Sequence, residues 1–180
     1  SKGAQTFMQK IGVWQALKKF TTPIEHIHVS QKGYLGITTL HADEVDVDAL
    51  GFSVQSSDLG AVLWQLANQE ENLTILCPAL LETFNENKEY VLATVVSADD
   101  AKQPLVEIEA QLIVGADGTQ SKVRVIAQLP IEEKSYGAFG VLAQIETEQH
   151  PQGWAFERFT EEGPVALLPM HGHFHKAVLV

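Results

Sequence analysis

The residues whose types and spacing best suit ligand chemistry lie at 112–124, where the chain reads LIVGADGTQSKVR. Apolar residues predict a buried strand that runs into Gly115, and Asp117 and Gly118 then predict a tight turn. Both glycines permit positive φ angles and let the backbone approach a ligand closely. Ser121 can cap a helix whose free N–H groups would attract an anionic cofactor. From these residues alone, an ordinary structural Asp-Gly turn remains the alternative.

Histidines at regular spacing could also bind a ligand. His26 and His28 lie two positions apart on a predicted strand, and His171, His173 and His175 repeat that spacing. A zinc site needs three or four convergent ligands, typically with help from cysteine or carboxylate groups. Alternating surface histidines on strands account for both groups, so we predict no metal site.

The single cysteine, Cys77, lies in the apolar run 73–77, which predicts a short buried strand. No cation lies near it in sequence, so we expect an inert buried thiol rather than a nucleophile. One cysteine cannot form an internal disulfide, which favours a reducing, cytoplasmic location.

Composition narrows the class of protein. Of 180 residues, 45% are hydrophobic and 19% are charged, as in globular proteins. Twelve basic residues against 23 acidic ones give a net charge of −11. Nucleic-acid binding requires clustered Lys and Arg, so we predict no nucleic-acid partner.

The hydrophobic pattern predicts an α+β fold. Apolar residues at three- and four-residue spacing predict helices at 4–20 and 58–69, the second one capped by Ser57. Alternating apolar and polar residues predict a hairpin of two strands at 24–29 and 34–40. Further strands are predicted at 73–77, 80–86, 89–96, 104–114, 134–147, 154–159, 164–169 and 174–180.

The pattern Gly-Ala-Asp-Gly-x-x-Ser-x-Val-Arg at 115–124 resembles the DG motif of the class A flavoprotein monooxygenases, the p-hydroxybenzoate hydroxylase superfamily. The resemblance implies that Asp117 and Gly118 contact FAD near its pyrophosphate and ribityl chain. It also implies that Arg124 supports the turn or the nicotinamide nucleotide. A solvated helix arginine is the plain alternative for Arg124.

A second resemblance involves Gln55, a polar residue directly before a predicted helix in Gly51-Phe-Ser-Val-Gln. In these hydroxylases such a residue touches the flavin nucleotide, and an exposed polar residue is the alternative. Other segments resemble the ubiquinone-biosynthesis branch, most closely the 2-polyprenyl-6-methoxyphenol hydroxylases. These segments are 12–14, 24–30, 33–36, 154–160 and 163–169.

The resemblance implies FAD-dependent hydroxylation of a polyprenylated phenol, with NAD(P)H as reductant and O₂ as oxygen source. It is compatible with a complex with other ubiquinone-biosynthesis proteins and with peripheral contact with the inner membrane. Two alternatives stay open. One is a class A hydroxylase acting on a small aromatic acid, which a basic residue facing the substrate would favour. Arg158 is the evident arginine in the 134–180 region. The other is a non-catalytic α+β binding module.

In fold terms, the resemblance implies a mixed or antiparallel substrate-domain sheet plus part of a Rossmann-like FAD-binding domain. The expected parts are 1–23 and 51–133 for FAD, and 24–50 and 134–180 for the substrate sheet. Strands from both sheet segments should join in one sheet. Candidate lining residues over the flavin are Phe139, Val141, Trp154, Phe156 and Leu167, although core packing explains each as well.

Two family hallmarks, a G-x-G-x-x-G fingerprint and a C-terminal Gly-Asp motif, do not occur in the chain. Both normally flank the region that resembles this sequence. We therefore expect an internal fragment of a longer enzyme, inactive by itself.

Overall fold

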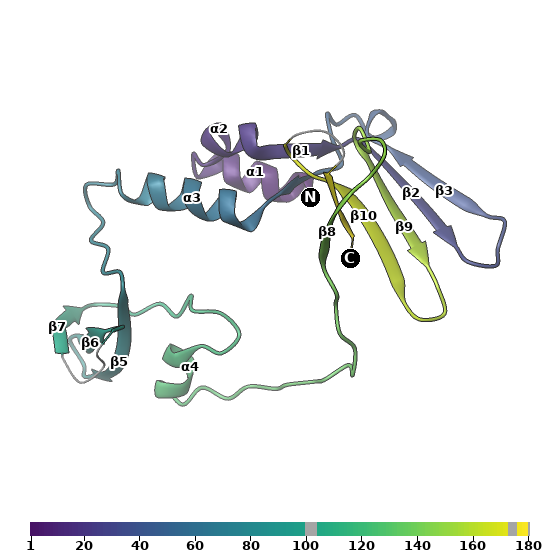
Figure 1. Ribbon diagram of the computed structural model, residues 1–180. Helices are drawn as coiled ribbons and strands as arrows, with labels where there is room; N and C mark the ends of the chain where they lie inside the picture. Colours follow the sequence, from purple (N-terminus) through teal and green to yellow (C-terminus); the bar gives the residue numbers. More distant parts are fainter. Residues whose placement is uncertain (100–103, 173–175, 180) are drawn as a thin grey trace. The chain divides into compact units, whose positions relative to one another are not determined.

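The computed structural model describes residues 1–99, 104–172 and 176–179 (Figure 1). Contacts divide the chain into two units, one formed by residues 1–73 and 138–180 and the other by residues 74–137. The second unit is thus an insertion in the sequence of the first. The division into flavin and substrate parts stays a prediction.

The first helix of the first unit ends at a glycine. α1 spans Lys2–Lys10, and Gly12 beyond it adopts a φ of 78°. The N–H groups of Gly12 and Val13 bond back to carbonyls of the last turn at 3.1 and 2.9 Å, which is the Schellman motif. The predicted single helix over 4–20 is therefore wrong. The elements that follow are α2 (Trp14–Leu17) and the 3-10 helix η1 (Lys18–Phe20).

A small core holds the helices of the first unit together. α3 spans Ser56–Ala67, and its Val62 packs with Val13 and Leu17 in a buried cluster. Apolar side chains at this spacing were predicted to face a core, and burying them is the main source of stability here. Among the described residues, no helix is long and apolar enough to cross a membrane.

Two strands of the first unit were missed in the sequence. β1 (Thr21–Ile24) pairs antiparallel with β4 (Gly51–Val54), and Thr21 faces Val54 in the register. Pro23 lies inside β1, and a proline within a run argues against a strand. Here it is tolerated because β1 has a partner on one side only.

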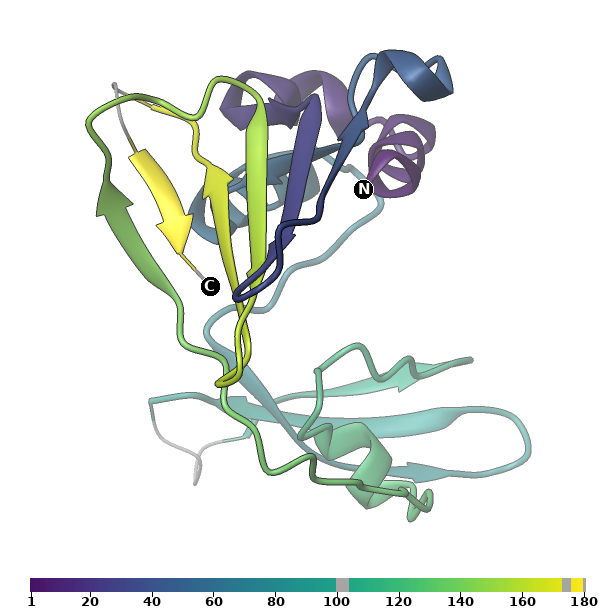
Figure 2. The same ribbon diagram turned by 90° about the vertical axis from the view of Figure 1, so that its right-hand side faces the viewer.

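The main sheet of the first unit has six strands in the order β3-β2-β9-β10-β11-β8 (Figure 2). All neighbours are antiparallel except β2 and β9, which run parallel. The prediction that early and late strands join in one sheet is confirmed. The strands are β2 (His26–Gln31), β3 (Ile37–His41), β8 (Ala143–Glu146), β9 (Trp154–Phe159), β10 (Pro164–Pro169) and β11 (Lys176–Leu179), with the 3-10 helix η2 (Asp43–Val45) after β3.

The second unit contains a three-stranded antiparallel sheet in the order β5-β6-β7. Its strands were predicted at nearly these positions, and Val95 and Val96 of the central strand are buried. A short helix, α4 (Lys122–Ile126), follows the sheet in sequence. The strands are β5 (Ala79–Glu86), β6 (Val91–Ser97) and β7 (Pro104–Ala110).

One predicted strand is wrong, and two others are shorter than predicted. Residues 73–77 and 112–115 form no strand, and within 134–147 only β8 forms. Cys77 is exposed, so the expected buried thiol is wrong as well. A short apolar run forms a strand only where a neighbouring strand pairs with it. None of the described strands pairs with residues 73–77 or 112–115. The last predicted strand, 174–180, is seen as β11, and its remaining positions lie outside the described residues.

Truncating Leu17 should destabilise the first unit much more than truncating Leu63. Leu17 is 3% exposed and Leu63, on α3, is 39% exposed. We expect Leu17→Ala to lower the free energy of unfolding by about 2–5 kcal/mol, because it leaves a cavity in the core. Leu63→Ala, the matched control, should cost less than about 1 kcal/mol. Urea unfolding measures both, and equal losses would contradict this account of the core.

Candidate functional site

The Asp117 carboxylate organises the turn before α4. The Ser121 hydroxyl donates to Asp117 Oδ1 at 2.5 Å. The N–H groups of Lys122 and Val123 donate to Asp117 Oδ2 at 2.6 and 3.2 Å. The Ser121 oxygen accepts from the Arg124 N–H at 3.1 Å, so Ser121 caps α4 as the sequence predicted.

This network changes what the turn can offer a cofactor. The N–H groups of residues 122–124 already have partners within the chain, and α4 is only five residues long. The expectation that this helix presents free N–H groups to an anion is therefore wrong. Asp117 fixes the turn, and a cofactor contact at Asp117 stays a prediction.

Glycine is required at Gly115 and at Gly118 for different physical reasons. Gly118 adopts a φ of 83°, and a Cβ built on it meets nothing within 4 Å. Space beside Gly118 is thus open to an approaching ligand. A Cβ at Gly115 would lie 2.9 Å from Val123 Cβ, so Gly115 is required by packing. The expected positive φ does not occur at Gly115.

Arg124 belongs to the same turn. Its Nη2 donates to the Thr119 carbonyl oxygen at 2.8 Å, which ties the guanidinium to the turn backbone. The side chain is half-buried rather than a solvated helix arginine. A role of Arg124 towards a nicotinamide nucleotide stays a prediction.

Hydrogen bonds also set the charge of Asp117. The bond from the Ser121 hydroxyl is the largest cause that lowers the pKa of Asp117, and the N–H groups of Val123 and Lys122 lower it further. Partial desolvation of the carboxylate raises the pKa of Asp117 and so opposes these hydrogen bonds. Donors to an ionised carboxylate favour the charged form, so Asp117 is negative at neutral pH.

Gln55 lies in the first unit, at the start of α3. It is the N-cap residue in place of the predicted Ser57, with an extended backbone (φ −73°, ψ 138°) and no side-chain cap bond. The N-terminus of this 12-residue helix therefore lacks a side-chain cap. Uncapped N–H groups and the positive helix end suit an anionic or hydrogen-bonding ligand, although Asp58 in the first turn opposes an anion.

A cavity of about 520 Å³ adjoins Gln55, and we call it the Gln55 cavity. One side consists of residues 52–57, from β4 and the start of α3. The other side comes from the main sheet: Leu142, Gln144 and residues 168–171. Its size suits a small organic ligand, and its walls combine apolar side chains with a few polar groups.

The residues predicted to line a surface over the flavin do not line this cavity. Leu168 lines it, and successive strand residues point to opposite faces, so Leu167 points away. Phe156 pairs with Leu167 in the register and therefore shares that other face, as does Trp154. Phe139 and Val141 lie outside every strand, and Phe139 is 97% exposed. None of these five residues lines the Gln55 cavity.

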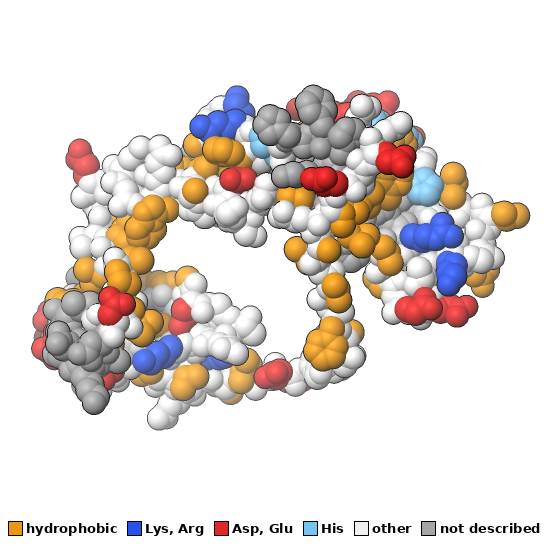
Figure 3. Space-filling view, viewed as in Figure 1, with side chains coloured by type: hydrophobic (Ala, Val, Ile, Leu, Met, Phe, Trp, Pro, Cys, Tyr) orange, Lys and Arg blue, Asp and Glu red, His pale blue; other side chains and the backbone are white. Residues whose placement is uncertain are grey.

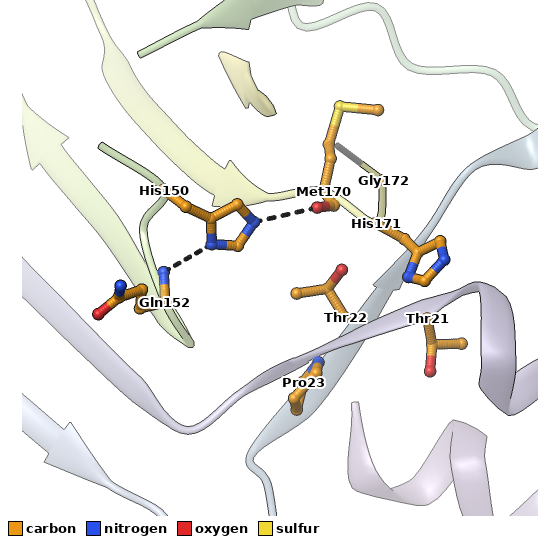
Figure 4. A pocket seen from close by; sticks show the side chains of 8 residues that line it. All are labelled: Thr21, Thr22, Pro23, His150, Gln152, Met170, His171 and Gly172. Atoms are coloured by element: carbon orange, nitrogen blue, oxygen red, sulfur yellow. Dashed lines mark hydrogen bonds between the residues drawn. The ribbon is translucent and has the colours of Figure 1, made fainter. Parts of the chain in front are cut away.

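A second cavity, of about 670 Å³, lies beside His150 in the first unit, and we call it the His150 cavity (Figure 4). It is lined by residues 21–23, His150, Gln152 and residues 170–172. His150 Nδ1 accepts from the Gln152 N–H at 2.9 Å, so Nε2 carries the hydrogen and faces the Met170 carbonyl at 3.2 Å. Both ring nitrogens of His150 are thus hydrogen-bonded within the chain, with Nδ1 as an acceptor.

The predicted histidine group on β2 is part of a ring cluster. His26 Nδ1 lies 2.8 Å from His41 Nδ1, and the Trp154 ring lies 4.6 Å from the His26 ring. His28 faces Phe156 at 5.8 Å. Within the described ranges, no group of three metal-binding side chains occurs. His173 and His175 lie outside those ranges.

The predicted site residues divide between the two units. Asp117, Gly118 and Arg124 lie together in one turn of the second unit, and Gln55 lies in the first. Sequence reasoning missed Gln144 and Leu168 as cavity residues. The alternation along 164–169 could have identified the face of Leu168, but which face is covered depends on the distant β4–α3 segment.

Comparison with known proteins identifies the family of the chain. The family described as FAD binding domain matches residues 4–180, nearly the whole chain. The chain belongs to the FAD binding domain family.

Relatives within this family include ubiquinone hydroxylases. Ubiquinone hydroxylase UbiL of Rhodospirillum rubrum is 29% identical over 170 residues, which cover 94% of this chain and 38% of that protein. The 3-demethoxyubiquinol 3-hydroxylase of Escherichia coli is 23% identical over 182 residues, covering 99% and 44%. The chain therefore spans about two fifths of the length of these relatives.

Solved structures share the fold of the family. p-Nitrophenol 4-monooxygenase PnpA of Pseudomonas putida matches 97% of this chain and 45% of its own, with a TM-score of 0.66 and 11% identity. HpxO of Klebsiella pneumoniae, complexed with FAD and uric acid, matches 97% and 44%, with a TM-score of 0.66 and 13% identity. The expected mixture of helices and antiparallel sheet is confirmed.

Acid should loosen the turn that Asp117 holds. Because the folded-state pKa of Asp117 is lowered, its stabilising effect is complete above the unfolded value near 4 and is lost as pH falls through the folded value. We expect the Lys122 and Val123 amides to keep their hydrogen-exchange protection from pH 7 to about 4 and to lose it below. Asp117→Asn should remove this pH dependence.

A carboxylate elsewhere in the second unit provides the control. Glu109 is exposed on β7, so Glu109→Gln should keep the wild-type acid response of the two amides. If Asp117→Asn titrated like the wild type, the assignment of the acid response to Asp117 would be wrong.

Proposed function

We propose that the full-length gene product is an FAD-dependent monooxygenase that hydroxylates a polyprenylated phenol in ubiquinone biosynthesis, using NAD(P)H and O₂. The observation that carries the proposal is the Gln55 cavity, in a chain of the FAD binding domain family. This cavity places a polar residue and an uncapped helix start opposite apolar strand residues. The names of the ubiquinone hydroxylase relatives support the substrate class.

In this proposal, Gln55 and the turn of Asp117 and Gly118 contribute to FAD binding. Two features fit it: the uncapped start of α3 at Gln55 and the open space beside Gly118. Asp117 acts by fixing the turn that carries Gly118, and Arg124 ties down the same turn and serves the NAD(P)H site. When bound, FAD supplies the activated oxygen, while the chain orients the ring and excludes water.

The charges of the residues that line the Gln55 cavity favour a substrate ring without a carboxylate group. Among the described residues that line the Gln55 cavity, none is a lysine or an arginine. Arg158 shares a sheet face with Phe156, which points away from Leu168. Figure 3 shows basic side chains (blue) only in small separate groups on the face in view. The lining thus offers a carboxylate substrate no lysine or arginine to pair with, which favours a phenol with an apolar tail over a small aromatic acid.

Other parts of the proposal concern the setting of the enzyme. We assign residues 1–23 and 51–133 to the FAD-binding part and residues 24–50 and 134–180 to the substrate sheet. A polyprenylated substrate dissolves in lipid, so we propose a cytoplasmic enzyme that works at the inner-membrane surface with other ubiquinone-biosynthesis proteins.

Replacing Gln55 should weaken FAD binding. One lost hydrogen bond of about 0.5–1.5 kcal/mol corresponds to roughly a twofold to tenfold rise in the Kd. We expect Gln55→Ala to show this in flavin-fluorescence titration of the full-length gene product. Gln69→Ala, an exposed change just beyond the other end of α3, is the control and should bind FAD like the wild type. Equal Kd values for all three proteins would remove Gln55 from the flavin site.

Substrate preference tests the reaction itself. We expect kcat/KM for a prenylated phenol to exceed that for p-hydroxybenzoate by at least about tenfold, because the tail contributes buried apolar area and the acid lacks a partner. The measurement is hydroxylated product formed per NAD(P)H oxidised by the full-length gene product. Preference for the small acid would favour the alternative class A hydroxylase, and the absence of both reactions would favour a binding module.

A further inference from the structure

We propose that the His150 cavity binds the first isoprene units of the substrate tail, while the ring and the flavin meet at the Gln55 cavity. This inference rests on the proposed function and adds a second binding site to it. The two cavities belong to the first unit and share a wall, because Met170 and His171 line both. The two cavities thus adjoin each other at the residues that follow β10 (Pro164–Pro169), where we infer that a ligand passes from one to the other.

The chemistry of the His150 cavity suits a hydrocarbon. Among its described lining residues, none carries a carboxylate, ammonium or guanidinium group. Two of its five polar side chains are bonded within the chain: both His150 nitrogens have partners, and the Thr21 hydroxyl donates to the Lys18 carbonyl at 2.8 Å. A tail that covers these groups removes few hydrogen bonds to water, so its burial carries a small polar penalty.

The shared wall also suits a flexible chain. Met170 is 5% exposed, and its unbranched thioether side chain can adapt to an irregular apolar ligand. His171 is exposed and lies at the edge of the His150 cavity, as Figure 4 shows for its ring beside Thr21. A volume of about 670 Å³ falls in the range of small-molecule sites.

Tail length is the variable that tests this site. Each fully buried methylene contributes roughly a fourfold gain in affinity, and the open side of the cavity lowers that figure. We expect the KM of the full-length, FAD-loaded gene product to fall by at least about tenfold from a tailless phenol to the same phenol with two isoprene units. If the phenols are hydroxylated but the KM does not change with tail length, the inference is overturned and the proposed function still stands.

A pair of variants at one position locates the tail. Thr21 lines the His150 cavity but not the Gln55 cavity. Thr21→Glu places a carboxylate against the tail and should reduce the tail-length gain to less than about threefold. Thr21→Val removes the same hydroxyl without adding charge and should keep the gain. Loss of the gain in both variants, or in neither, would overturn the inference.

A binding measurement separates failure of the tail site from failure of the reaction. Farnesol carries three isoprene units and no phenol, and its binding can be followed as a rise in the thermal unfolding midpoint. We expect the rise in the wild type and in Thr21→Val, and its loss in Thr21→Glu. If no phenol is hydroxylated but farnesol follows this pattern, the proposed function fails and the isoprenoid site stands. If farnesol produces no rise in the wild type, the isoprenoid site fails.

Discussion

Backbone hydrogen bonds between β2 and β9 join two segments that are separated in sequence by the whole second unit. Gly153 is central to this junction, because its carbonyl accepts from the N–H groups of Glu25 and His26 at 2.8 and 3.0 Å. Its φ is 82°, and a Cβ there would lie 3.1 Å from the Glu25 carboxylate. A side chain at Gly153 would therefore strain the backbone and crowd the place where the two halves of the sheet meet.

Both cavities depend on that junction. β2 pairs with one edge of β9 and β10 with the other, and Met170 and His171 directly follow β10. Ser53 of β4 donates a short hydrogen bond to the Pro169 carbonyl, which ties the end of β10 to the segment that leads into Gln55. A cavity wall made from residues so distant in sequence needs the sheet to be complete before the site exists.

Much of this architecture could be predicted from local patterns, and the failures have physical causes. Alternation identified β9 and β10 with their observed bounds, because each has neighbouring strands on both sides. The break at Gly12 was missed because apolar periodicity continues through it, although a glycine beyond a helical run is itself a stop signal. Apolar runs at 73–77 and 112–115 predicted strands, yet the formation of a strand is decided by a partner that local sequence does not show.

The candidate site was predictable in its residue types more than in its geometry. The motif marked Asp117, Ser121 and Arg124, and the structure joins all three in one network. The Asp117 carboxylate bonds to N–H groups of α4 because of the exact turn conformation. Residue spacing alone does not predict that conformation. The residues that line the Gln55 cavity were not predictable, because alternation divides a strand into two faces but does not say which face the rest of the fold covers.

The β2–β9 junction also sets an order of events on the ribosome. β2 and β3 emerge before the second unit, and β9 emerges after it. Until β9 is synthesised, the edge of β2 that will pair with it exposes unpaired backbone groups, which other chains can bind. The sheet of the second unit joins strands that are neighbours in sequence, so its loops close at lower entropic cost and it forms earlier. Aggregation and chaperone binding therefore compete with folding mainly after the β2–β3 hairpin has formed and before β9 has been synthesised.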